Sequence, residues 1–201
     1  MLIGVDKAQK KGKHELKHSM LQEDGNELFF MPIPVGDYIK ITPEIEDVIK
    51  RRGNKLSKMD TIGLIDVSID TKRDMEELYS CLVQDHSRFS DSCFLAYNNG
   101  IKLIILVENE NGVTDVNSID VWRNEKRWKS YYAAVKRAKY QNKKLPKEPV
   151  KPSQLKKTMW TMNKKYGVIF MFCHPLETAD VIKKLLNSEG VNDICLKKSN
   201  A

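Results

Sequence analysis

The sequence has no long run of apolar residues. Its longest apolar stretches, at 101–107 and 168–173, are far shorter than the roughly 20 residues that span a bilayer, so they are typical of buried strands. The N-terminus also lacks the basic head and apolar segment of a cleavable signal peptide. These absences argue against a membrane partner, and we expect the protein to stay in the cytoplasm.

Cysteine pairs at the spacing of metal ligands are absent too. The four cysteines include no Cys-x-x-Cys pair, and three of them lie in apolar patterns: Cys81, Cys93 and Cys173. We therefore expect buried free thiols. His14 and His18 have the spacing at which one helix could chelate a metal, but the lysines around them favour a solvated helix face.

Acidic residues are scarce in one long region. The formal net charge is +7, and in region 123–157 the lysines and arginines face only Glu125 and Glu148, with aromatic residues interleaved. Such a stripe fits contacts with phosphates and stacking on bases. The alternative is a surface helix whose aromatic side chains pack on a sheet. The nucleic-acid-binding candidates are Arg123, Lys126, Arg127, Lys129, Lys136, Arg137 and Lys139.

The stretch 64–82 contains a strand that runs directly into a helix. Side chains alternate along 64–72, and one face of the strand is apolar: Ile65, Val67, Ile69 and Thr71. The other face is polar: Asp66, Ser68, Asp70 and Lys72. Helical spacing of apolar residues begins immediately afterwards. Charges gathered where a strand meets a helix indicate a functional site.

The pair Asp70 and Lys72 has a specific chemical use. A carboxylate can hold a divalent metal ion, and a lysine on the same strand face can orient or deprotonate water, or offset charge on a phosphate. A metal site of this kind needs a second acid. Asp37 is the candidate, because it lies in the turn Pro34-Val-Gly-Asp-Tyr38 beside an apolar run.

These residues resemble the signature of the XPF-type nuclease domain of the PD-(D/E)XK superfamily, which reads Gly-Asp, a gap, then Glu-Arg-Lys-x-x-x-Asp. Gly36-Asp37 matches the first part, and Asp70-Thr71-Lys72 stands in place of Glu-Arg-Lys. Glu76 stands where the final Asp is expected. The chain departs from the family at Thr71, which replaces an arginine, and at Ala8-Gln9, which replaces Arg-Glu in the first element.

The resemblance implies a metal-dependent DNA endonuclease that acts on branched or flapped DNA. Asp37 and Asp70 would hold Mg²⁺ or Mn²⁺, and Lys72 would position or activate the attacking water. Secondary candidates for ligands are Asp6, Glu76 and Glu108. The family also implies a homodimer. The alternative is a catalytically inactive relative that keeps the fold and binds nucleic acid or a protein partner, and the departures from the signature favour it.

Strands alternating with helices predict an α/β three-layer sandwich with a central mixed sheet, and the resemblance makes it restriction-endonuclease-like. We expect strands at 2–6, 27–33, 62–71, 101–108 and 168–173. Helices are expected at 14–23, 43–53, 72–83, 86–98, 118–142 with Ser118 as its cap, 153–167 with Ser153 as its cap, and 176–188. Prolines predict a linker at 145–152, so a basic helix and linker at about 115–152 form an insertion in a single domain, 1–201.

Overall fold

A single mixed sheet organises the molecule. The computed structural model describes residues 1–9, 12, 14–110 and 112–187, and within them six strands lie in the order β2-β1-β3-β4-β5-β6. β3 is antiparallel to both of its neighbours, and the other neighbouring strands are parallel. The strands are β1 (Leu2–Asp6), β2 (Glu27–Met31), β3 (Tyr38–Lys40), β4 (Val67–Lys72), β5 (Lys102–Glu108) and β6 (Ile169–Cys173).

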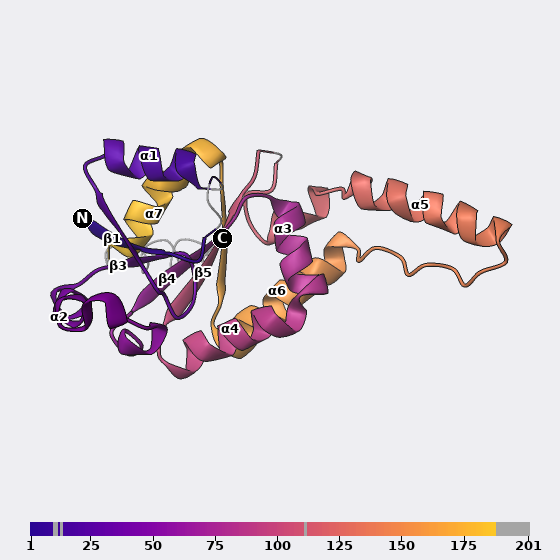
Figure 1. Cartoon of the computed structure of the whole chain (residues 1–201). Coiled ribbons are helices and arrows are strands. Elements are labelled where there is room, and N and C mark those ends of the chain that lie inside the picture. Colours follow the sequence, from indigo (N-terminus) through magenta and orange to yellow (C-terminus); the bar gives the residue numbers. More distant parts are fainter. Residues whose placement is uncertain (10–11, 13, 111, 188–201) are drawn as a thin grey trace.

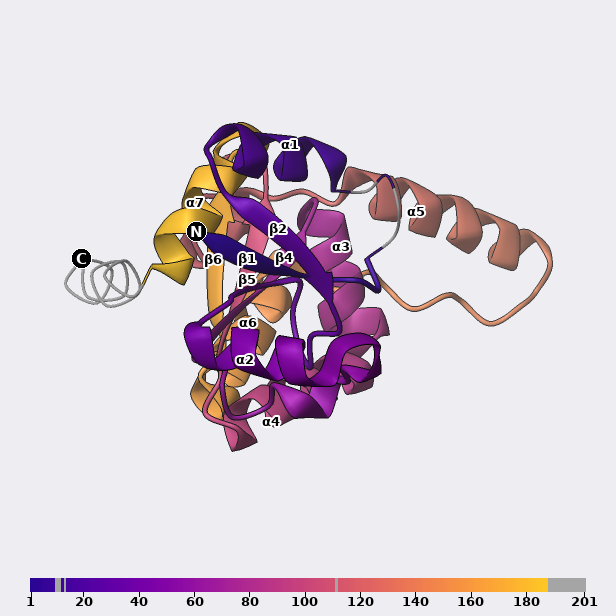
Figure 2. The ribbon, with the colours of Figure 1, turned by 60° about the vertical axis from the view of Figure 1, so that its left-hand side comes forward.

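Helices cover both faces of this sheet (Figure 1). One face packs against α1 (Glu15–Glu23) and α7 (Thr178–Leu186). The other packs against α3 (Met75–Tyr79), α4 (His86–Asn98) and α6 (Pro152–Tyr166), and α2 (Pro43–Arg52) lies just above α4 in the view of Figure 2. The predicted α/β three-layer sandwich with a mixed sheet is confirmed.

The core explains why β5 lies inside the sheet. Ile104 and Leu106 are fully buried against the α1 and α7 layer, whereas Ile105 and Val107 are fully buried against the α4 and α6 layer. A parallel strand with helices on both sides must be apolar on both faces, which is why its sequence forms a continuous apolar run and does not alternate.

Most predicted elements form where the sequence places them. The helices expected at 14–23, 43–53 and 86–98 are present, and the strands at 2–6 and 101–108 agree to within a residue. Helix α6 ends at Gly167, whose φ of 67° is left-handed. The helix expected at 176–188 is α7; residue 188 lies outside the described residues.

Several boundaries differ from the prediction. β3 was not expected, because three residues after a Pro-Gly turn carry too little periodicity to be recognised. The strand expected at 27–33 ends at Met31, just before Pro32, which has no backbone N–H to donate. The helix expected at 72–83 is α3 followed by a π-helical turn at Ser80–Gln84. Helix α6 begins at Pro152, so Ser153 lies inside it and Lys151 is its N-cap.

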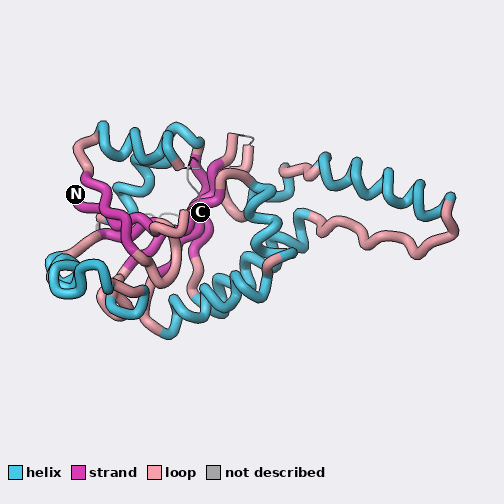
Figure 3. Tube along the Cα trace, viewed as in Figure 1, coloured by secondary structure: helices cyan, strands magenta, loops and turns pink. Residues whose placement is uncertain are grey.

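The basic helix begins later than predicted. Ser118 lies in a 3₁₀ turn, where its hydroxyl accepts hydrogen bonds from the backbone N–H groups of Thr114 and Asp115. Helix α5 (Glu125–Tyr140) is capped by Asn124, whose side chain accepts from the Arg127 N–H at 3.2 Å. Figure 3 shows α5 and the extended segment 143–151 projecting from the body as a hairpin, which we call the arm.

The remaining expectations concern thiols, aromatic residues and membranes. Cys93 and Cys173 are buried and Cys81 is half-buried, and all three are free thiols as predicted. Tyr97 of α4 is 60% exposed, and its ring packs against that of Tyr166. None of the helices in the described part of the chain is long and apolar enough to cross a membrane.

Candidate active site

The site starts at Gly36, which allows the turn before β3 to approach β4 closely. Gly36 has φ of 81°, a backbone conformation that favours glycine. A Cβ added there would lie 2.2 Å from the Ser68 Oγ and 3.1 Å from the Ile69 carbonyl oxygen. The Ser68 hydroxyl donates to the Val35 carbonyl at 2.6 Å, and the Asp37 N–H donates to the Ile69 carbonyl at 2.7 Å. The Gly-Asp pair is therefore a requirement of packing as well as a motif.

The Asp37 carboxylate is held by Thr71. Its Oδ2 accepts from the Thr71 backbone N–H at 2.8 Å and from the Thr71 hydroxyl at 2.6 Å. Thr71 is 2% exposed, so these bonds are shielded from water. In the sequence, Thr71 stands where the family signature has an arginine. Nothing in the strand pattern indicated that its hydroxyl would orient Asp37.

Asp70 and Lys72 form a close ion pair on β4. The Lys72 ammonium donates to both carboxylate oxygens of Asp70, at 2.6 and 2.7 Å. The Asp70 side chain is 22% exposed and the Lys72 side chain is 10% exposed. Residues two apart on a strand point to the same face, which is why the pair can form without any bend in β4.

The electrostatics of the site connect Asp37 to this pair. Burial raises the pKa of the Asp70 carboxyl; Lys72 opposes this effect and the Asp37 carboxylate adds to it. Burial by itself would lower the pKa of the Lys72 ammonium, but the adjacent Asp70 carboxylate outweighs burial and raises that pKa. The Asp37 carboxylate therefore acts electrostatically on both members of the pair, whereas the Lys72 ammonium is hydrogen-bonded to Asp70.

A half-buried thiol borders this group. Burial raises the pKa of Cys81 to about 11, and the charges of both Lys72 and Asp70 act on it. Cys81 is therefore protonated at neutral pH. It therefore borders the site as an uncharged side chain.

The donor set is compatible with a hard divalent cation. Mg²⁺ is usually bound by one or two carboxylates, with water and substrate oxygens completing the shell. Asp37 and Asp70 supply two carboxylates near the end of β4. With the single ammonium of Lys72, they leave the group with an excess of negative charge. Among the described residues, no cluster of three or more His, Cys, Asp or Glu side chains could hold a metal ion.

The secondary candidates have other roles in the structure. The Asp6 carboxylate accepts from the backbone N–H groups of Ala8 and Ile33, and the Asp6 N–H donates to the Asp37 carbonyl at 2.9 Å, so Asp6 supports the backbone behind the site. Glu108 pairs with Lys17 of α1 in the opposite layer, where both side chains are nearly fully buried.

Glu76, which occupies the position of the final acid in the motif, turns away from Asp70. It forms an ion pair with Arg127, and its Oε2 accepts from the Asn124 side chain at 2.8 Å. The expectation that Glu76 is a metal ligand conflicts with these contacts, because both of its oxygens are used at the base of the arm. The first turn of α3 rotates the side chain towards α5, and sequence spacing alone cannot show this rotation.

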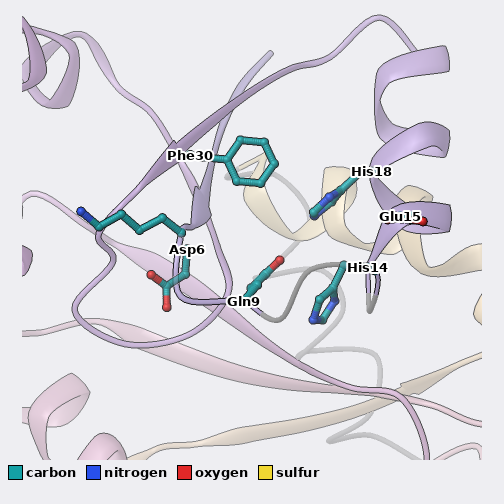
Figure 4. Close-up of a pocket in the computed structure, with 8 residues that line it drawn as sticks. Asp6, Gln9, His14, Glu15, His18 and Phe30 are labelled. Carbon is teal, nitrogen blue, oxygen red and sulfur yellow. The ribbon is translucent and has the colours of Figure 1, made fainter.

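The sequence favoured a solvated helix face for the paired histidines. In the structure they instead line a small cavity (Figure 4). His14 is 6% exposed, its ring lies 6.1 Å from that of His18, and the His18 Nε2 lies 3.1 Å from the Tyr38 hydroxyl. Burial, with help from the adjacent Lys17, lowers the pKa of His18. The cavity has a volume of about 160 Å³ and adjoins the Asp37 backbone, because Gln9 on its wall donates to the Asp37 carbonyl at 3.4 Å.

The predicted nucleic-acid-binding residues divide into two groups. Six of them are exposed on the arm or just before it: Arg123, Lys126, Lys129, Lys136, Arg137 and Lys139. Arg127 differs, because its guanidinium lies 4.3 Å from the centre of the Tyr79 ring and pairs with Glu76. Arg127 therefore helps to anchor α5, a role that the sequence did not predict, and its contact with nucleic acid stays a prediction.

No protein-family profile and no curated protein matches the sequence. Among solved structures, the chain is similar to XPF from Aeropyrum pernix, with a TM-score of 0.51 and 15% sequence identity. The match covers 94% of this chain and 61% of that protein, so this chain spans less than two thirds of its length. The likeness concerns the fold: an α/β sandwich with a mixed sheet, similar to that structure and consistent with the predicted restriction-endonuclease-like class.

Proposed function

We propose that the protein is a divalent-metal-dependent DNA endonuclease. The observation that supports this proposal most directly is the meeting of Asp37, Asp70 and Lys72 at the end of β4 in an XPF-like fold. The three residues come from two segments far apart in the sequence. The close approach of the two segments at Gly36 supports this grouping.

Asp37 and Asp70 would hold Mg²⁺ or Mn²⁺, which supplies Lewis-acid polarisation of a phosphodiester and a more acidic water. Thr71 fixes the direction of the Asp37 carboxylate, since its backbone N–H and its hydroxyl both donate to one carboxylate oxygen. Lys72 carries a positive charge at neutral pH, so it can hold a water molecule or a phosphate oxygen through its N–H donors.

The proposed substrate is DNA with a branch or a flap. This choice follows the resemblance to structure-specific nucleases in the sequence. Exposed cations on the arm support a polyanionic substrate, because they are followed by few carboxylates that could neutralise them.

The second candidate is a nucleic-acid-binding protein without catalysis. One observation favours it: both oxygens of Asp70 accept from Lys72, so the pair is internally satisfied without a cation. The loss of the family's arginine at Thr71 points the same way. An active enzyme requires Lys72 to exchange this partner for water or phosphate.

The experiment that separates the two candidates measures cleavage and binding side by side. Flap, fork, junction and linear duplex DNA are incubated with the wild type in Mg²⁺, Mn²⁺ or EDTA. We expect cleavage of a branched substrate by the wild type, and a loss of roughly 10³-fold, equivalent to about 4 kcal/mol, in Asp70→Asn and in Lys72→Met.

Asp66→Asn is the matched control, since it removes one exposed carboxylate from the residue just before β4. It should leave cleavage within about twofold of the wild type. If the wild type binds these substrates in all conditions and cuts none of them in either metal, the endonuclease proposal is wrong. The second candidate, a nucleic-acid-binding protein without catalysis, is then supported.

A further inference from the structure

The arm contains none of the three residues Asp37, Asp70 and Lys72 that form the candidate site. Helix α5 contains 16 residues, and Ala138 is its one buried residue. At 1.5 Å per residue, the helix is about 24 Å long. It leaves the body beside α3 and points outward, as Figures 1 and 2 both show.

The base of the arm is fixed to the helix that follows the site. Tyr79 of α3 receives the Arg127 guanidinium on its ring, and its hydroxyl accepts from the Val150 N–H at 3.2 Å. The Trp122 ring lies 6.1 Å from the same tyrosine ring. One buried residue thus contacts the chain before the arm, the first turn of α5 and the end of the return segment, so the arm leaves the body in a defined direction.

The two long faces of α5 differ in chemistry. Arg127, Tyr131, Ala134 and Ala138 recur at helical spacing, and each of them is buried or half-buried. The exposed cations Lys129 and Lys136 lie on the opposite face, and Lys126 and Arg137 lie on a flank between the two faces. The one carboxylate within the helix, Glu125, lies near Lys129 at 3.6 Å at the base, so the outer half of the face has no acid to offset its charge.

We propose that the arm binds the phosphate backbone of duplex DNA beside the scissile bond and sets the length of duplex that the enzyme needs. This inference rests on the proposed function. The phosphates of one strand rise about 3.4 Å per base pair along the axis of the duplex, so a helix of about 24 Å lying along that axis spans about seven base pairs. Because the arm starts beside Glu76, four residues after Lys72, the row of cations begins near the site and runs away from it.

Duplex DNA fits this face better than a single strand does. Sequence-independent binding of single strands depends on aromatic rings with free faces. In the arm, the Trp128 ring lies 5.7 Å from the Tyr131 ring, edge to face, and 5.7 Å from the Tyr132 ring at a tilt, so these three rings pack against one another. An anchored helix with cations along its length matches the regularly spaced phosphates of a duplex.

The test varies the length of duplex on one side of the branch, from 4 to 16 base pairs, with the full-length protein. Affinity is measured in EDTA and cleavage in Mg²⁺. For the wild type we expect affinity and kcat/KM to fall about tenfold when the flank becomes shorter than roughly seven base pairs. The variant Lys136→Gln/Arg137→Gln/Lys139→Gln should bind long flanks about tenfold more weakly, change less than twofold with flank length, and lower the salt slope by about two to three.

The matched control removes the same charge elsewhere. Lys40, Lys50 and Arg51 are exposed cations on β3 and α2, and Lys40 lies beside the start of β4, at the opposite end of that strand from Asp70. Their triple Gln variant should keep the flank dependence of the wild type. Equal flank dependence in the wild type and in the arm variant would overturn the inference, as would equal affinity for a single strand of the same length.

The two proposals fail in different ways. Cleavage with no dependence on flank length leaves the nuclease proposal intact and removes the role of the arm. Dependence of affinity on flank length in EDTA, together with no cleavage in any metal, supports the arm and contradicts the nuclease proposal.

Discussion

The body and the arm of this molecule are built on opposite principles. In the body, β5 is buried on both faces and its residues are determined by packing between two helical layers. In the arm, α5 buries one residue of 16 and is held by a few contacts at its base. Substitutions in the body should therefore change stability and chemistry together, whereas substitutions in the arm should change DNA binding and leave stability nearly constant.

The largest effect on stability is expected at Gly36, where the turn before β3 approaches β4. Gly36→Ala places a methyl group against Ser68 and forces an unfavourable φ, so we expect a loss of about 2–4 kcal/mol in the free energy of unfolding. Any folded protein should also cut DNA poorly, because Asp37 is displaced. Chemical denaturation and cleavage assays measure the two effects.

Gly63→Ala is the control for strain without a clash. Gly63 has φ of 84°, and nothing lies within 4 Å of an added Cβ. We expect it to cost about 1 kcal/mol and to leave cleavage unchanged. If both variants lose the same stability, the close approach to Ser68 is not what requires glycine at position 36.

A smaller effect in the body is expected at Thr71. Thr71→Val removes the hydroxyl donor from Asp37 while it keeps the backbone donor and nearly the same volume. We expect a loss of about 1–2 kcal/mol in stability and of about tenfold in Mn²⁺ affinity. Thr71→Ser should restore the affinity for Mn²⁺, and an affinity unchanged in the valine variant would show that Thr71 does not position Asp37.

The smallest effect on stability is expected in the arm. Arg127→Ala removes an ion pair and a cation–π contact that are both partly exposed, so the body should lose less than about 1 kcal/mol. The arm should nevertheless become loose. Limited digestion with chymotrypsin at Tyr140, which is 91% exposed, should become several times faster.

Arg123→Ala is the matched variant, because Arg123 is an exposed arginine just before α5. Its digestion rate should equal that of the wild type. Equal rates for all three proteins would mean that the Arg127 contacts do not hold the arm.

The same contrast explains what the sequence could predict. Strands β1 and β5 and helix α4 follow from hydrophobic periodicity, which reports burial in a body with two helical layers. The start of α5 was misplaced because Ser118 has the chemistry of a helix cap but is used in a preceding turn. In an arm with little burial, periodicity could not correct that choice.

In the site, residues within one strand were predictable and contacts between segments were not. The shared face of Asp70 and Lys72 follows from strand geometry alone. Asp37 could be named as the second acid from its turn, but its position relative to the pair could not be derived, because the two segments are more than thirty residues apart in the sequence. The Thr71 hydroxyl on Asp37 and the Glu76 pair with Arg127 depend on how segments pack, and residue type alone gave no signal for either.

The central claim is that Asp37 and Asp70 together bind one divalent ion. Titration of Mn²⁺ into the wild type, followed by electron paramagnetic resonance of the free ion, tests it without reference to cleavage. We predict one site per chain, lost in Asp37→Asn and in Asp70→Asn and kept in Asp66→Asn. Binding that is unchanged in both site variants, or absent from the wild type, would contradict the account.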